Sequence, residues 1–96
     1  MRIRWSPRSR DQTRAIFDFI ADDRPEVAEQ ILEALLERVR LLTEFPGQGA
    51  SLPGFDRPDL RSVVHGSFRI IYRADAEEVV VLAVRHTRME PGREEG

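Results

Sequence analysis

The 96-residue sequence contains no cysteine and no lysine, and few of its residues are aromatic. The lack of cysteine excludes disulfide scaffolds, thiol chemistry and every zinc site that uses cysteine. Without lysine there is no Schiff-base chemistry, and all fifteen cationic side chains are permanently charged guanidinium groups. No apolar run is long enough for a transmembrane helix, and the first residues lack a signal-peptide pattern. We therefore expect a cytoplasmic protein with no membrane partner.

The net charge of −2 conceals segments of opposite sign. Residues 1–17 carry five arginines and one acid, whereas residues 18–44 carry three arginines and eight acids. Residues 57–73 are again basic, with four arginines and one acid. A molecule with separate basic and acidic surfaces is suited to charged partners.

Hydrophobic periodicity predicts one α+β domain over residues 1–88, with the order β-α-α-β-β-β. The Ser6-Pro7 pair predicts the start of a first helix that reaches about residue 21. A second helix follows the Asp22–Pro25 start signal and ends before Pro46-Gly47. The connection is short, so the helices should form an antiparallel hairpin packed on a small antiparallel sheet. The expected strands cover residues 1–5, 60–64, 68–73 and 79–85; residues 46–59 should form an irregular loop, and residues 89–96 a mobile acidic tail.

Familiar metal, nucleotide and nucleophile motifs are absent from the sequence. His65 and His86 lie far apart and lack the spacing of metal ligands, so we expect no metal. The Gly47-Gln48-Gly49 segment follows a helix and lacks the later glycine and lysine of a phosphate loop. No serine has the surroundings of a nucleophile elbow. We therefore expect no cofactor.

Arginines alternate with apolar residues in the third predicted strand, residues 68–73. Arg69 and Arg73 should face away from Phe68, Ile70 and Tyr72, and Arg85 joins them if the last strand is a neighbour. Several guanidinium groups on one surface form a candidate site for phosphate or carboxylate. The alternative is a solvated face whose arginines pair with local acids. Trp5 and Tyr72 are expected in the core with satisfied polar atoms, and His86 is either an acid–base group or a surface residue.

The order of several segments resembles the ParE/RelE toxin superfamily over about residues 1–88. The segments are W-x-P and I-F-D-F-I-A near the start, P-E-V-A-E-Q-I-L, L-L-T-E-F-P-G-Q-G, L-R-S-V-V-H-G-S-F-R-I-I-Y-R, and V-V-V-L-A-V-R-H-T-R. The most specific pieces are residues 67–72 and 84–86. The resemblance implies a helical hairpin on a small antiparallel sheet, as the periodicity does.

The resemblance also implies a toxin of a type II toxin–antitoxin pair, held inactive in a hetero-oligomer with its antitoxin. RelE-like members cut messenger RNA on the ribosome without metal, whereas ParE-like members inhibit DNA gyrase. The implied antitoxin contacts are Phe17, Ile20, Ile31, Leu35, Arg69 and Arg85. The implied residues for the target or a phosphate are Arg61, Arg69, Arg73 and Arg85.

Features of both branches occur, but the ParE-like ones predominate. The Pro25 helix start and the residues 84–86 resemble ParE, and no tyrosine follows Tyr72 where RelE-like chains carry a reactive group. We therefore predict a ParE-like gyrase inhibitor without catalytic activity and with a ParD-like antitoxin. The first alternative is a metal-independent endoribonuclease that uses Arg69, His86 and Arg61. The second is a non-toxic relative that only binds its antitoxin.

Overall fold

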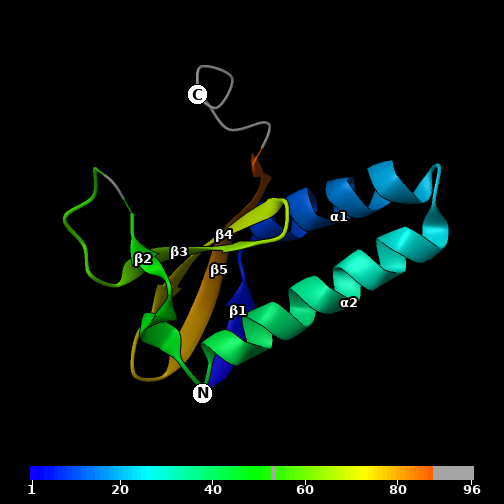
Figure 1. Cartoon of the computed structure of the whole chain (residues 1–96). Helices are drawn as coiled ribbons and strands as arrows, with labels where there is room; N and C mark the ends of the chain where they lie inside the picture. The colour runs from blue at the N-terminus through cyan, green and yellow to red at the C-terminus, as the bar shows by residue number, and fades with distance from the viewer. Residues whose placement is uncertain (53, 88–96) are drawn as a thin grey trace.

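The two predicted helices and four predicted strands form in the predicted order, together with one additional short strand (Figure 1). The computed structural model describes residues 1–52 and 54–87, so the expected tail at residues 89–96 lies outside the described residues. The predicted α+β class is confirmed. The elements are β1 (Arg2–Trp5), α1 (Pro7–Ala21), α2 (Pro25–Leu42), a 3-10 turn η1 (Pro46–Gln48), β2 (Ala50–Ser51), β3 (Leu60–His65), β4 (Phe68–Ala74) and β5 (Glu78–His86).

The helices begin where the sequence signals predict. Ser6 has extended backbone angles, and its Oγ accepts a hydrogen bond from the Ser9 N–H at 3.1 Å, which caps α1. Pro7 and Pro25 occupy first-turn positions in α1 and α2, where a missing N–H costs no intrahelical hydrogen bond. Only three residues separate the helices, which form the expected antiparallel hairpin at the right of Figure 1.

The sheet has the strand order β1-β5-β4-β3-β2 and is mixed. Strands β2 to β5 pair antiparallel as expected, whereas β1 pairs parallel to β5. Parallel pairing requires a long crossover between the strands, and the intervening chain with both helices provides it. The expected irregular loop also contains β2, whose two residues pair with Ser62 and Arg61 of β3.

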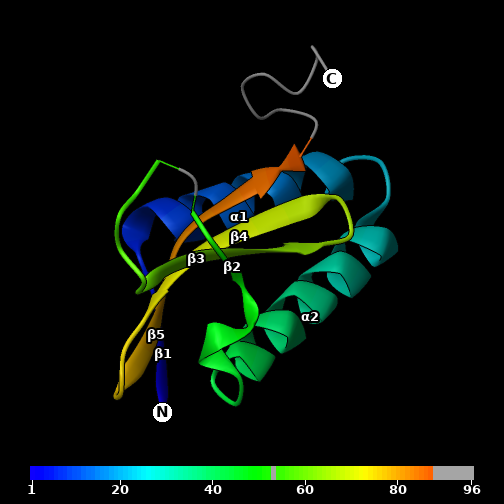
Figure 2. The ribbon, with the colours of Figure 1, turned by 60° about the vertical axis from the view of Figure 1, so that its left-hand side comes forward.

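One face of the sheet packs against the helical hairpin (Figures 1 and 2). Leu35 and Val39 of α2 join side chains of β4 and β5 in one buried cluster, and Leu42 anchors a second. The sheet residues of these clusters are Ile70, Tyr72, Val79, Val81 and Val84. The opposite face, which we call the open face, is not covered by a helix within the described part of the chain.

A β-bulge interrupts the alternation of β5. Tyr72 pairs with Val81 and Ile71 with Ala83, which leaves Leu82 as an extra residue. The start of α1 satisfies nearby backbone groups: Ser6 Oγ donates to the Leu82 carbonyl at 3.1 Å. Gln12 Oε1 accepts from the Val84 N–H at 2.8 Å. The bulge allows residues 81 and 84 to share the helix-covered face, so that Arg85 lies on the open face.

Tyr72 is buried in the core, as predicted, and its hydroxyl holds the chain that follows α2. The hydroxyl donates to the Pro46 carbonyl at 2.7 Å and accepts from the Gly49 N–H at 2.9 Å. A Cβ on Gly49 would lie 2.7 Å from both the Ser62 carbonyl oxygen and the Tyr72 hydroxyl, so the position requires glycine. Trp5 is half-buried and packs against the core cluster.

Candidate functional site

The open face gathers arginines from two neighbouring strands. Arg69 of β4 and Arg85 of β5 are direct cross-strand partners, and Arg73 lies on the same face of β4. The alternation of β4 explains why Arg69 and Arg73 lie on this face, because the residues between and beside them are buried against the helices: Phe68, Ile70 and Tyr72. Arg85 reaches this face only because of the bulge at residue 82.

A groove of about 630 Å³ runs along the open face, and we call it the arginine groove. Three arginines line it from three different elements: Arg8 of α1, Arg69 and Arg85. Ser62 accepts a hydrogen bond from Arg69 Nη1 at 3.3 Å. The remaining lining residues are apolar, and among those the structure describes none is acidic: Leu52, Phe55, Leu60, Ile71, Leu82 and Ala83. The groove therefore combines a cationic rim with an apolar floor.

Arg8 and Phe55 belong to this groove, and sequence reasoning missed both. Arg8 stands on the first turn of α1, and helical periodicity alone does not relate that turn to a sheet face. The bulge contact between Ser6 and Leu82 brings the start of α1 to the groove. Phe55 comes from the Pro- and Gly-rich loop after β2, and 57% of its surface is exposed. In the sequence, the only signal was a phenylalanine in a segment with several glycines and prolines.

The other end of the open face is neutralised by acids. The Glu78 carboxylate lies 3.0 Å from Arg4 and 3.6 Å from Arg73, and Arg73 also lies 3.3 Å from Asp75. The hydrogen bond from Arg4 is the main cause that lowers the pKa of Glu78 below its ordinary value. Backbone N–H groups of residues 77 and 78 lower the pKa of Asp75. Arg73 is therefore part of a local ion-pair network and does not line the arginine groove.

Arg61 lies on the other face of the sheet, which corrects its expected grouping with Arg69, Arg73 and Arg85. Its direct cross-strand partner is Tyr72, a residue of the helix-covered face. Its Nη1 donates to the Gly49 carbonyl at 2.8 Å. Arg61 therefore helps to fasten the segment after α2.

His86 also lies on the helix-covered face. It pairs with Phe68 across the strands, and the two rings meet edge to face with their centroids 5.4 Å apart. Its neighbour Arg85 faces the opposite side with Arg69. The structure thus separates the three residues of the predicted ribonuclease site, Arg69, His86 and Arg61, across the sheet.

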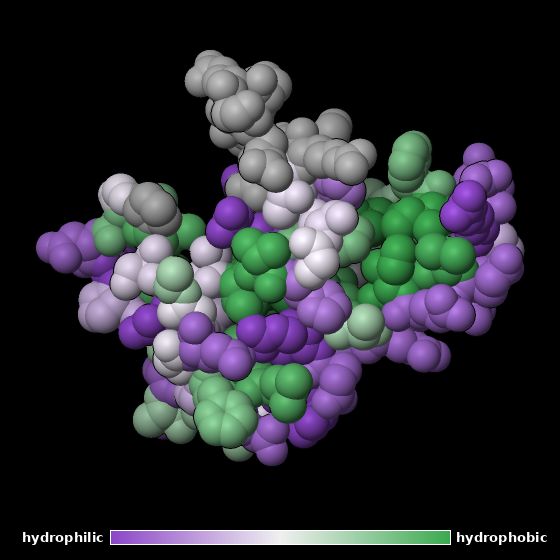
Figure 3. Space-filling model, in the orientation of Figure 1, coloured by the Kyte–Doolittle hydropathy of each residue, from purple (hydrophilic) through white to green (hydrophobic). Residues whose placement is uncertain are grey.

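A second groove, of about 560 Å³, lies between the helices and the β3–β4 turn, and we call it the apolar groove. Figure 3 shows a green apolar patch over α1 and α2 in this part of the molecule. Phe19 is the most exposed of its large side chains, with 82% of its surface accessible. The groove is lined by Ala15, Ile16, Phe19, Ile20, Ile31, Ser67, Phe68 and His86.

Five of the six predicted antitoxin contacts line three different grooves, and the sixth lies in the core. Ile20 and Ile31 line the apolar groove, whereas Phe17 lines a separate groove with Trp5 between the helices. Arg69 and Arg85 line the arginine groove on the other face. Leu35 is only 2% exposed and belongs to the core, which corrects the expectation that it contacts a partner.

The described residues contain no group of three or more histidines, cysteines or acids that could hold a metal ion. Neither helix in that part of the chain is both long and apolar enough to cross a membrane.

Comparisons of the sequence and of the structure relate the chain to known proteins. The model for the ParE toxin of type II toxin–antitoxin systems, parDE, matches residues 3–91. The chain is similar to a solved chain of the chromosomal ParDE toxin–antitoxin system from P. aeruginosa, with 24% identity and a TM-score of 0.73 over 90% of this chain and 95% of that one. It is also similar to a chain of the RelBE2 toxin–antitoxin complex from Mycobacterium tuberculosis, with 23% identity and a TM-score of 0.61 over 88% and 95%. No curated protein sequence matches the chain.

Proposed function

Since the chain belongs to the ParE toxin family of type II toxin–antitoxin systems, we propose that it inhibits DNA gyrase and is neutralised by a ParD-like antitoxin. The proposed inhibitor acts by binding and carries out no chemistry of its own. We place its action in the cytoplasm, where gyrase works on DNA.

The separation of Arg69, His86 and Arg61 is the observation that favours a gyrase inhibitor over a ribonuclease. A general acid or base must come within hydrogen-bonding reach of the group whose proton it moves. His86 and Arg61 lie on the helix-covered face, whereas Arg69 lies on the open face. A phosphate held by Arg69 on the open face would therefore lie across the sheet from His86 and Arg61.

The proposed antitoxin binds at two surfaces. Its apolar side chains occupy the apolar groove, where Ile20 and Ile31 are accessible beside Phe19. Phe17 offers a further contact between the helices. An acidic portion of the antitoxin pairs with Arg69 and Arg85 on the other face, because guanidinium groups bind carboxylates with good geometry. Both structural relatives come from toxin–antitoxin systems, which supports a complex of this kind.

Parallel pulse labelling of DNA and protein synthesis tests the proposal. The chain is induced without an antitoxin, and thymidine and methionine incorporation are followed from the same culture. We expect DNA synthesis to stop first. Purified chain should also inhibit gyrase-driven supercoiling of a relaxed plasmid, and added antitoxin should restore it.

The variant His86→Ala separates the two mechanisms, with Arg24→Ala as a surface control. A gyrase inhibitor keeps its order of arrest in both variants. Early loss of protein synthesis that disappears in His86→Ala would replace the proposal with ribonuclease action. A chain that arrests neither synthesis would be an antitoxin-binding relative without toxicity.

A further inference from the structure

The arginine groove places like charges directly opposite each other. Arg69 and Arg85 are cross-strand partners in an antiparallel pair, an arrangement that destabilises a sheet. Arg8 adds a third cation from the start of α1. A bound anion between these side chains would offset their repulsion, so the cluster suits an anionic ligand.

The charge of the groove is local and opposes the charge of the whole molecule. The chain carries a net charge of −2, yet the groove collects three arginines and no acid among its described lining residues. None of the ion pairs that the described residues form involves Arg8 or Arg85. The arginines at the other end of this face, Arg4 and Arg73, are paired with Glu78. Arg8 and Arg85 thus bring to the groove positive charge that none of these ion pairs balances.

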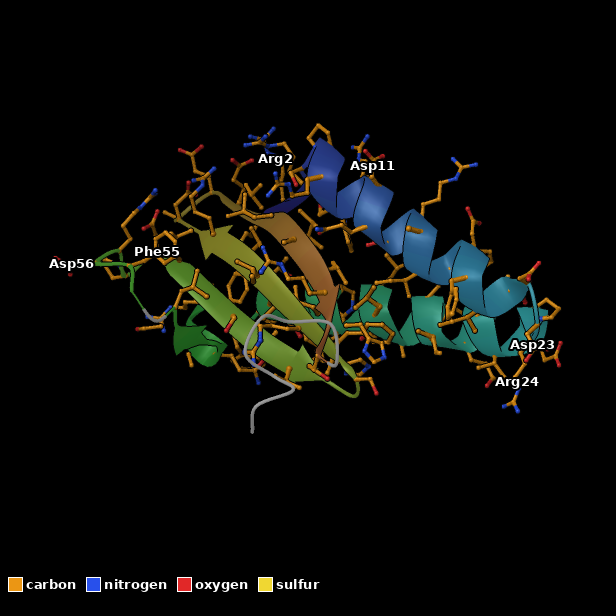
Figure 4. All side chains as sticks on the ribbon, turned by 90° about the horizontal axis from the view of Figure 1, so that it is seen from above. Arg2, Asp11, Asp23, Arg24, Phe55 and Asp56 are labelled. Carbon is orange, nitrogen blue, oxygen red and sulfur yellow. The ribbon has the colours of Figure 1, made fainter. Side chains whose placement is uncertain are left out.

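The groove also offers an aromatic surface beside its cations. Phe55 is more than half exposed, and Leu52 and Ile71 continue the apolar floor. Figure 4 shows Phe55 at the end of the molecule opposite Asp23 and Arg24. A basic groove with an accessible aromatic ring is the pattern by which proteins bind single-stranded nucleic acid, with phosphates on the cations and bases stacked on the ring. A purely acidic peptide would leave the aromatic ring and the apolar floor without contacts.

We propose that the arginine groove binds single-stranded DNA, with phosphates on Arg8, Arg69 and Arg85 and a base stacked on Phe55. The inference rests on the proposed function, because the action on gyrase brings the chain to DNA. The ligand binds without any covalent step. In the cell, the strand would be a segment exposed at the gyrase-bound DNA, and the toxin would hold both partners.

Fluorescence anisotropy of a labelled oligothymidine of about 12 nucleotides tests the groove without gyrase. The full chain is titrated into the probe at salt concentrations from about 50 to 200 mM. Three phosphate contacts predict a slope of about −2 for the logarithm of the binding constant against that of salt, which amounts to an about 20-fold loss of affinity over this range. Arg85→Ala should make the slope shallower by about 0.7.

Two further variants test the assignment of individual residues. Phe55→Ala should weaken binding at least about fivefold and leave the salt slope unchanged, because it removes stacking and no charge. Arg24→Ala, at the other end of the molecule, removes one cation outside the groove and should leave both quantities unchanged. An equal loss in Arg24→Ala and Arg85→Ala would overturn the groove as the binding site, and so would an affinity unaffected by Phe55→Ala.

The remaining outcomes separate this inference from the proposed function. If the chain inhibits gyrase but gives no saturable binding to the oligonucleotide, the proposed DNA binding by the groove is wrong and the proposed function stands. If the chain binds the oligonucleotide but leaves gyrase active, the proposed function is wrong and the DNA binding by the groove stands. Tighter binding to a matched oligouridine would assign the groove to RNA and overturn the proposal.

Discussion

At the residue scale, Gly49 joins the segment after α2 to the sheet. Its N–H donates to Tyr72 and its carbonyl accepts from Arg61, so both of its backbone groups are used. The position is crowded, because an added Cβ would lie 2.7 Å from the Ser62 carbonyl oxygen. These contacts of Gly49 position the start of the loop that carries Phe55 to the arginine groove.

Gly49→Ala should destabilise the chain by about 1–3 kcal/mol, the usual cost of overpacking a close contact. Urea unfolding followed by circular dichroism gives the value. Gly47→Ala is the matched control, since a Cβ on Gly47 meets no atom within 4 Å. Equal stability of the two variants would show that the Tyr72 contact does not constrain this segment.

A second residue-scale prediction concerns the Glu78 carboxylate. Its pKa is lowered below the ordinary value of 4.5, chiefly by the hydrogen bond from Arg4. A carboxyl group whose pKa is lower in the folded state stabilises the fold above its unfolded pKa, and this stabilisation is lost as the pH falls through the folded value. The unfolding free energy of wild type should therefore exceed that of Glu78→Gln at pH 7, and the gap should narrow as the pH falls below the ordinary value of 4.5. A gap that is independent of pH would contradict the assignment.

At the scale of elements, the bulge in β5 determines which of its side chains lie on the helix-covered face and which lie on the open face. Without the extra residue, Arg85 would share a face with Val81 and lie against the helices. With it, Val84 and His86 lie on the helix-covered face and Arg85 joins Arg69. Bulges often re-aim side chains beside functional sites, and here the start of α1 supports the altered backbone.

Gln12→Ala should destabilise the chain by about 1–3 kcal/mol, because the partly buried Val84 N–H loses its acceptor. Chemical unfolding measures the loss. Gln30→Ala, an exposed position on α2, serves as the control and should change stability by less than about 0.5 kcal/mol. If both variants unfold alike, the contact between α1 and the bulge contributes nothing to stability.

Periodicity predicted the helices, the long strands and the faces of β4, because each signal is local. The bulge could not be predicted from the sequence, because residues 79–84 are all apolar and such a run shows no alternation of apolar and polar residues. The position of Arg61 was predictable. A two-residue turn between β3 and β4 pairs it with a residue of the buried face, either Ile70 or Tyr72, and never with Arg69. Arg8 and Phe55 required the tertiary structure, because nothing local ties them to the sheet.

At the scale of the whole molecule, two surfaces of different chemistry lie on opposite sides of one ladder. Adjacent residues supply both: Phe68 and His86 line the apolar groove, and Arg69 and Arg85 line the arginine groove. A partner that occupies the apolar groove therefore need not cover the open face. This arrangement would allow an antitoxin to hold the toxin by its apolar surface and to block the target by its acidic part.

Phe19→Ala should weaken antitoxin binding at least about tenfold, because a large exposed aromatic side chain in an apolar groove is typical of an interface hot spot. Phe19 is 82% exposed in the free chain, so its truncation should leave the unfolding free energy nearly unchanged. Phe45→Ala is the matched control: it removes another exposed phenylalanine, at 61%, outside the groove. Isothermal titration of both variants with the antitoxin decides the matter. Equal losses of affinity would mean that the antitoxin does not use the apolar groove as its anchor, and the two-surface arrangement would have to be abandoned.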